Sequence, residues 1–345
     1  MPRPDSNDST QVRAGLQGAD HGSHRLTSPW TPLWQLFYRL RPARWSAYVR
    51  DHWIGKPLVT ALPMTWLLLF FLVPFIIVFG ISFSQSVLAI PPYEPLWQMM
   101  EDKVLALRLH LGNYNYLFTD SLYIDSYLYS VKVAAVSTLC CLLLGYPMAY
   151  GIARSTPTLR NLYLMLIILP FWTSFLLRVY AWIGLLKNNG VINNVLMALG
   201  IIQEPITMMQ TDFAVYIGIV YSYLPFMILP LYSNLEKHDR TLLEAAADLG
   251  SRPWKAFMRI TLPLSMPGVV AGSLLVFIPA VGEYVIPSLL GRTDQLMIGR
   301  VLSDEFFSNS DWPGASSVAI LMLLLLMVPI AAFQYFQSRE LRKRT

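Results

Sequence analysis

Three charged side chains, Lys132, Arg178 and Glu283, lie inside long apolar stretches of this 345-residue chain. An ionisable group is costly in apolar surroundings, so it usually faces a cavity or a partner of opposite charge. Two roles are therefore open for Glu283. It could form a structural ion pair or triad with Arg178 or Lys132 that ties helices together, or it could face a pathway and meet a cationic substrate.

Aromatic side chains gather in the same stretches and could serve the second role, because aromatic rings attract ammonium groups. Besides Glu283, the candidate substrate-path residues are Trp172, Tyr180, Tyr223 and Tyr284. Packing between helices and contact with lipid are the alternative roles for these aromatics. Composition alone does not separate the two.

The chain carries none of the common catalytic motifs. It lacks the Gly-x4-Gly-Lys-Ser/Thr loop that binds nucleotide phosphates, the His-Glu-x2-His metal motif and the Gly-x-Ser-x-Gly nucleophile elbow. Its only cysteines, Cys140 and Cys141, are adjacent, which favours packing between helices over a disulfide or a metal site. The sequence thus predicts a protein that is not an enzyme and needs no cofactor or metal, so any transport must draw energy from a gradient or a partner subunit.

A polar, basic segment between two apolar stretches has its own regular pattern. Thr241 and Glu244 have the spacing of a helix-capping box, alanines follow, and Gly250 suits the position just past a helix end. We expect a short helix, a tight stop and a second helix around 254–261. An apolar face on the first helix would be formed by Leu242, Leu243, Ala246 and Leu249. That face either docks on a partner or packs on the chain's own helices.

The composition predicts a membrane protein. Apolar residues make up 54% of the chain and charged residues 14%, whereas soluble domains carry about 25% charged residues. Six stretches are long enough to cross a bilayer as helices. They cover residues 58–83, 127–153, 162–186, 213–232, 268–290 and 315–336.

The basic residues predict the orientation of these spans. If the N-terminus is cytoplasmic, 19 of the 26 Lys and Arg residues fall on the cytoplasmic side and five on the outer side. Both termini and the polar segment are then cytoplasmic, and the net charge of +5 needs no nucleic acid as its explanation. Acidic residues in the outer loops are either ordinary solvated charge or a surface that receives a cationic cargo.

Several spans contain residues that disturb or tighten helices. Pro170 lies in span three and Pro225 in span four, and prolines kink helices. Gly268 and Gly272 form a small-x3-small pair that permits close helix contact. Spans three and five both start at the inner boundary, so Arg178 and Glu283 lie roughly 22–24 Å from it, at 1.5 Å per residue. Together with Lys132 they are expected to share the outer half of the membrane.

The chain divides into four expected parts. Residues 1–28 are polar and predict a disordered cytoplasmic N-terminus rather than a signal peptide. Residues 29–57 mix aromatic and basic side chains, which suits an interfacial amphipathic segment on the inner leaflet better than nucleic-acid binding. A six-helix transmembrane domain over 58–336 contains the polar loop 234–266, and a basic cytoplasmic tail covers 337–345.

The polar loop reads Glu-Ala-Ala-x3-Gly-x9-Ile-x-Leu-Pro, and it resembles the cytoplasmic loop of binding-protein-dependent ABC importer permeases. The residues that carry this match, and that the resemblance assigns to ATPase coupling, are Glu244, Ala245, Ala246, Asp248, Gly250, Ile260, Leu262 and Pro263. Within that class, several segments resemble the spermidine/putrescine permeases, most closely the putrescine-type first permease subunit. These segments are 89–93, 168–176, 178–182, 187–191, 220–227, 277–287, 297–300 and 311–313.

The resemblance implies an all-α, six-helix permease of the type I ABC importer fold in a bacterial inner membrane. It implies as partners a second homologous permease, two ATPase subunits and a periplasmic polyamine-binding protein, with membrane lipid around them. The implied function is ATP-driven import of putrescine, with spermidine as a further cargo. A permease of the same fold for sulfate or iron, and a gradient-driven transporter, are the alternatives. Tyr284 and Ser288 depart from the family pattern, where a Phe and an acidic residue are expected.

Overall fold

A computed structural model describes residues 55–99, 105–239 and 241–344. The chain consists of two compact units, and the boundary between them lies between Leu72 and Val73. The expected disordered segment 1–28 and nearly all of the interfacial segment 29–57 lie outside the described residues, so these predictions stay untested.

The first unit contributes one stretch of apolar helix to the described part. It comprises α3 (Gly55–Leu67) and the π-helical turn η1 (Leu68–Leu72), and the chain continues into α4 (Val73–Ile81) of the second unit. Thr60–Ile81 is long and apolar enough to cross a membrane, close to the predicted 58–83.

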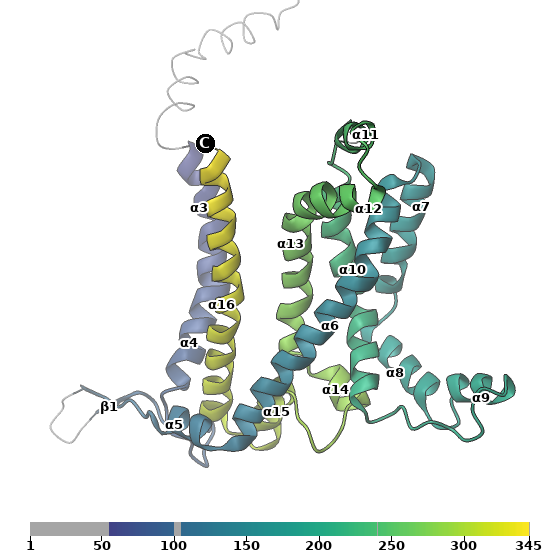
Figure 1. The fold of residues 1–345 in the computed structure, drawn as a ribbon. Helices are drawn as coiled ribbons and strands as arrows, with labels where there is room; N and C mark the ends of the chain where they lie inside the picture. Colours follow the sequence, from purple (N-terminus) through teal and green to yellow (C-terminus); the bar gives the residue numbers. More distant parts are fainter. Residues whose placement is uncertain (1–54, 100–104, 240, 345) are drawn as a thin grey trace, which may run out of the picture. The chain divides into compact units, whose positions relative to one another are not determined.

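The described residues of the second unit are mostly helical, and β1 (Trp97–Met99) pairs antiparallel with β2 (Leu105–Leu107). Its helices are labelled in Figure 1. After α4 they are α5 (Gly112–Thr119), α6 (Ser121–Arg154), α7 (Pro157–Ile168), η2 (Leu169–Trp172), α8 (Phe175–Leu186), α9 (Val191–Ala198), α10 (Asp212–Leu235), α11 (Thr241–Asp248), α12 (Pro253–Ala256), η3 (Phe257–Thr261), α13 (Leu262–Val281), α14 (Val285–Leu290), α15 (Ile298–Ser303), η4 (Asp304–Ser308) and α16 (Trp312–Arg344).

Three long helices, α6, α10 and α13, pack against one another at the centre of the second unit. Gly272 allows α13 to approach α10 closely, because a Cβ at this position would lie 3.0 Å from the carbonyl oxygen of Met227. A Cβ at Gly268 would lie 2.7 Å from Cβ of Asn234. The close contact predicted from this glycine pair is therefore confirmed.

Span three is broken, which corrects the prediction of one helix over 162–186. Pro157–Trp172 and Phe175–Ala198 are bent by 91° relative to each other. Thr173 and Ser174 leave the helical backbone region, with ψ of 149° and 138°. The hydroxyl of Thr173 donates a 2.7 Å hydrogen bond to the carbonyl of Pro170, which closes the preceding turn. The depth estimated for Arg178 assumed an unbroken helix and does not hold.

Span five also ends earlier than predicted. The long helix α13 ends at Val281, and Gly282, Glu283 and Tyr284 separate it from the short α14. At its other end the apolar helical stretch begins at Pro253, before the predicted start at 268. With the bent pair counted as one span, the described chain has up to six membrane-crossing spans, in agreement with the predicted number.

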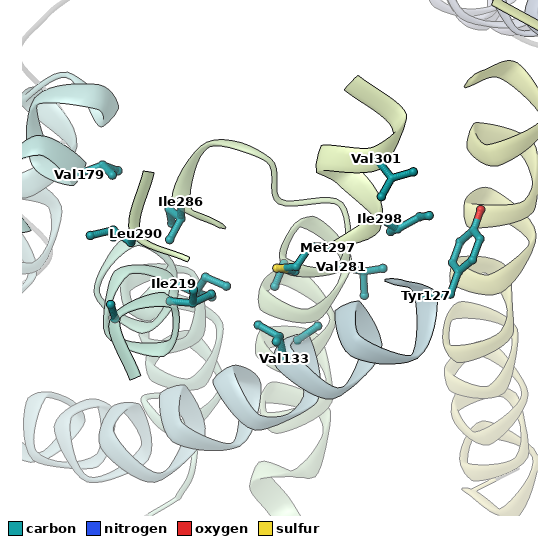
Figure 2. Close-up of a cluster of buried hydrophobic side chains, with 14 of the residues drawn as sticks. Tyr127, Val133, Val179, Ile219, Val281, Ile286, Leu290, Met297, Ile298 and Val301 are labelled. Carbon is teal, nitrogen blue, oxygen red and sulfur yellow. The ribbon is translucent and has the colours of Figure 1, made fainter. Parts of the chain in front are cut away.

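Two clusters of buried apolar side chains hold the second unit together. Figure 2 shows the larger one, in which side chains from α6, α8, α10, α14 and α15 meet. Ile219 of α10, Ile286 of α14 and Met297 before α15 are fully buried there. The smaller cluster joins α6, α10 and α13 and contains Cys141, so this thiol packs between helices as predicted.

Candidate functional site

Glu283 occupies the break between α13 and α14 and is 7% exposed. One carboxylate oxygen, Oε1, accepts hydrogen bonds from the backbone N–H groups of Val285 and Ile286, at 3.1 and 3.3 Å. The other oxygen, Oε2, accepts a short hydrogen bond from the hydroxyl of Tyr223 on α10. These donors satisfy a buried carboxylate and fix the direction in which α14 leaves the break.

A series of aromatic rings extends from this carboxylate to the break in span three. Tyr223 packs against Phe226 with ring centroids 6.0 Å apart, and Phe226 meets Phe171 edge to face at 5.2 Å. Phe171 belongs to η2, directly before the bend. The guanidinium of Arg178 lies over the Phe171 ring, 5.3 Å from its centroid. Charged residues at the two breaks are thus linked by contact through α10.

The ion pair considered from sequence is not present among the described residues, where neither Arg178 nor Lys132 reaches Glu283. Glu283 finds its donors in Tyr223 and the backbone, and an aromatic hydroxyl and two N–H groups replace the expected cation. Arg178 is half-buried against aromatic rings, with a buried Nε that has no hydrogen-bond partner. Lys132 is exposed on α6.

The other predicted path residues lie on the surface of the isolated chain. Trp172 is 85% exposed at the bend of span three, and Tyr180 on α8 is 57% exposed. Tyr284 is exposed at the break in span five, directly after Glu283. The structure therefore brings Glu283 and Tyr223 into contact and leaves these three aromatic side chains exposed.

The polar loop folds as the sequence predicts at its stop. Helix α11 spans Thr241–Asp248 and ends at Gly250, which has a φ of +76°. The N–H of Gly250 donates to the carbonyl of Ala247 at 2.8 Å, and the N–H of Ser251 donates to the carbonyl of Ala246 at 2.9 Å. This pair of bonds is the Schellman arrangement, in which the left-handed residue is usually glycine.

The start of α11 differs from the predicted capping box. Thr241 lies inside the helix, and the carboxylate of Asp239 accepts a 3.0 Å hydrogen bond from the Thr241 N–H. The cause is local, since Asp readily bonds the backbone two residues on. This hydrogen bond lowers the pKa of Asp239 below its usual value.

The apolar face of α11 is divided between the chain and solvent. Leu243 and Ala246 are half-buried towards the chain, whereas Leu242 is exposed and Leu249 is 88% exposed. Trp254 of α12 adds a ring that is 67% exposed. One side of this face therefore packs on the chain's own helices, and the other side is uncovered, so docking on a partner stays a prediction.

The remaining coupling candidates lie on α11 itself and on the helices that follow it. The side chains of Glu244, Ala245 and Asp248 are exposed on α11. Ile260 lies in η3, where the chain forms a π-helical turn, and Leu262 and Pro263 begin α13. The expected second helix over 254–261 is thus present as α12 and η3, and it continues without interruption into α13.

A cavity of about 300 Å³ lies beneath α11 and was not foreseen from the sequence. Leu243 and Ile260 line it from the loop, and Arg160 and Glu236 line it from the ends of α7 and α10. The last two form an ion pair, and Glu236 lies just past the end of α10. The 76-residue separation of these partners left no local signal in the sequence.

A larger groove of about 790 Å³ runs along α6, α13 and α16 and is almost wholly apolar. Thr138 and Ser273 are its only polar lining residues in the described part of the chain. Such a surface suits lipid tails or an apolar helix, and none of its lining residues in the described part of the chain is charged.

Comparison with known proteins gives one family and many relatives. The model of the family "binding-protein-dependent transport system inner membrane component" matches residues 142–343. The spermidine/putrescine transport system permease protein PotB of Haemophilus influenzae is 38% identical over 289 residues, which cover 84% of this chain and 96% of that protein. PotB of Salmonella typhimurium SL1344 is 40% identical over 279 residues, which cover 81% of this chain and 92% of that protein.

A solved structure has a similar fold. A bacterial ABC transporter involved in the import of the acidic polysaccharide alginate has a chain that superposes with a TM-score of 0.62 at 17% sequence identity. The match covers 86% of this chain and 99% of that one. At this identity the likeness concerns the arrangement of helices alone.

Proposed function

Since this chain belongs to the family of binding-protein-dependent transport system inner membrane components, we propose that it is the permease subunit of an ATP-driven importer of polyamines. The observation that carries the cargo class is the 38–40% identity to PotB permeases over more than four fifths of the chain. Putrescine is the proposed principal cargo and spermidine a second one. The chain is a transport subunit and not an enzyme.

The uncovered side of α11 is the proposed attachment site for an ATPase subunit. Leu242, Leu249 and Trp254 present apolar surface next to the charged Glu244 and Asp248, as at a protein interface. The rigid glycine stop and the continuous path from α12 into α13 support transmission of ATPase movement into the helices. Two ATPase copies are proposed, one for this chain and one for a second, homologous permease.

The excess of basic residues supports a cytoplasmic position for α11 and for both termini. The opposite end of the second unit then meets a periplasmic polyamine-binding protein. We place the cargo path along the exposed aromatics Trp172, Tyr180 and Tyr284, whose rings can bind ammonium groups. Alternating access in this proposal is a rearrangement of the two permeases around that path.

The test is reconstitution of the chain with candidate ATPase, second-permease and binding-protein partners in proteoliposomes. ATP-dependent uptake of labelled putrescine and spermidine, together with polyamine-stimulated ATPase activity, is the expected result. Sulfate and iron uptake in the same vesicles serve as the competing cargoes. Uptake of sulfate or iron without polyamine uptake would show that the cargo is not a polyamine. Polyamine uptake in vesicles that lack the ATPase would show that the chain is not part of an ATP-driven importer.

A further inference from the structure

We propose that the Glu283–Tyr223 hydrogen bond is a positioning device that makes the breaks in spans three and five move together, and that Glu283 is not itself a ligand for the cargo. The inference rests on the proposed function, because it concerns how that transport proceeds. Its residues all lie in the second unit.

Each carboxylate oxygen of Glu283 accepts a hydrogen bond from another part of the protein. Oε1 receives the N–H groups of Val285 and Ile286, which would otherwise be unpaired at the start of α14. Oε2 receives the hydroxyl of Tyr223, 60 residues away on α10. A cargo ammonium would have to displace one of these donors from a side chain that is 7% exposed. The adjacent Tyr284, in contrast, is open.

The aromatic contacts connect the Glu283–Tyr223 hydrogen bond to the break in span three. Tyr223 lies against Phe226, and Phe226 lies against Phe171, which ends the first half of span three. Ring packing of this kind is directional, so a shift of one ring displaces the next. If the Tyr223 hydroxyl follows Glu283 when α14 reorients, the bend at Thr173 is carried along with it.

The sharpest test removes one hydroxyl. Tyr223→Phe keeps the carboxylate and the ring, and should lower the maximal rate of putrescine uptake by about tenfold at unchanged KM, the loss expected of one hydrogen bond to a charged group. Tyr221→Phe is the matched control, because Tyr221 is on the same helix and its hydroxyl makes no hydrogen bond in the described part of the chain. A raised KM in Tyr223→Phe, or an equal effect in the control, would overturn the proposal.

The role of the charge is tested at Glu283 itself. Gln keeps the acceptor for the α14 N–H groups and can exchange a hydrogen bond with Tyr223, whereas Ala can do neither. Glu283→Ala should lose most of the uptake, and Glu283→Gln should recover much of the rate with the KM of the natural chain. If Gln is as poor as Ala and KM rises tenfold or more, Glu283 binds the cargo and the positioning role is wrong.

The link between the two breaks is tested by a double-mutant cycle of Tyr223→Phe with Phe171→Leu. Phe226 contacts both rings, and substitutions that act independently would give additive effects on the uptake rate. We expect the second substitution to add little once the first is present. Additive losses of uptake rate would show that Tyr223 and Phe171 act independently, and the proposed connection to span three would be wrong. The natural chain is assayed in the same vesicles, and absence of polyamine uptake there rejects the proposed function rather than this inference.

Discussion

Gly250 offers the most direct test of how α11 is held. It has a φ of +76°, a conformation that L side chains rarely adopt, and its neighbours form the two hydrogen bonds that end the helix. A Cβ added at this position would meet no atom within 4 Å. Replacement by Ala therefore causes no clash, and its whole cost lies in the backbone.

The size of that cost follows from the same geometry. An L-residue in the left-handed region is disfavoured by roughly 1–2 kcal/mol, which reduces the population of the intact helix end about 5- to 30-fold. Asn tolerates this conformation better than Ala, and β-branched Val tolerates it worse. Uptake per ATP hydrolysed should therefore fall in the order Asn, Ala, Val at position 250, while membrane insertion is unaffected.

Gly200 is the matched control, with a φ of +68° and equally open surroundings. It follows α9, far along the chain from the coupling loop, so Gly200→Ala has the same backbone cost without touching α11. The assay is the ratio of putrescine uptake to phosphate release in proteoliposomes. Equal uncoupling by Gly200→Ala, or full coupling in Gly250→Val, would refute the reasoning.

Three further predictions concern the loop and the central helices. Glu244→Ala should lower uptake more than ATP hydrolysis at equal amounts of inserted protein, because its exposed carboxylate belongs to the proposed docking face; equal losses in both activities would contradict this. The pKa of Asp239 is lowered in the folded chain, so its support of α11 is complete above the usual value of 3.8 and is lost as the pH falls through the lower folded pKa. Hydrogen exchange of the Thr241 amide should accelerate in that acidic window, and Asp239→Asn should remove the pH dependence. Gly272→Ala should destabilise the purified protein by about 1–3 kcal/mol, because the new methyl group would lie 3.0 Å from the carbonyl of Met227. The measurement is the melting temperature, which should fall. An unchanged melting temperature would mean that α10 and α13 can separate freely.

Features set by short stretches of sequence were predictable. The spans at 127–153, 213–232 and 315–336 match α6, α10 and α16 because long apolar runs have few alternatives to a helix in a membrane. Gly250 ends α11 as predicted because its backbone conformation depends on adjacent residues alone. The predicted cap at Thr241 was wrong, because Thr241 is already helical and its N–H donates to the carboxylate of Asp239.

Features that join distant segments were not predictable. The ion pair of Arg160 with Glu236 and the cavity beside it depend on how α7, α10 and α11 meet. Pro170 in span three indicated a disturbance, but the 91° bend depends on the backbone of Thr173 and Ser174 and on the packing of each half. Neither the hydrophobic periodicity nor the composition of span three specifies this bend angle.

The sequence by itself determined that this chain crosses a membrane several times, that it carries a helical loop of the importer type, and that Glu283 is an unusual charge in an apolar span. Only the tertiary structure decided the partner of that charge. Desolvation requires a buried carboxylate to find donors but does not specify which ones. The break after Val281 exposes two N–H groups and the packing of α10 brings in Tyr223, so hydrogen bonds, and not the ion pair considered from the sequence, hold this carboxylate.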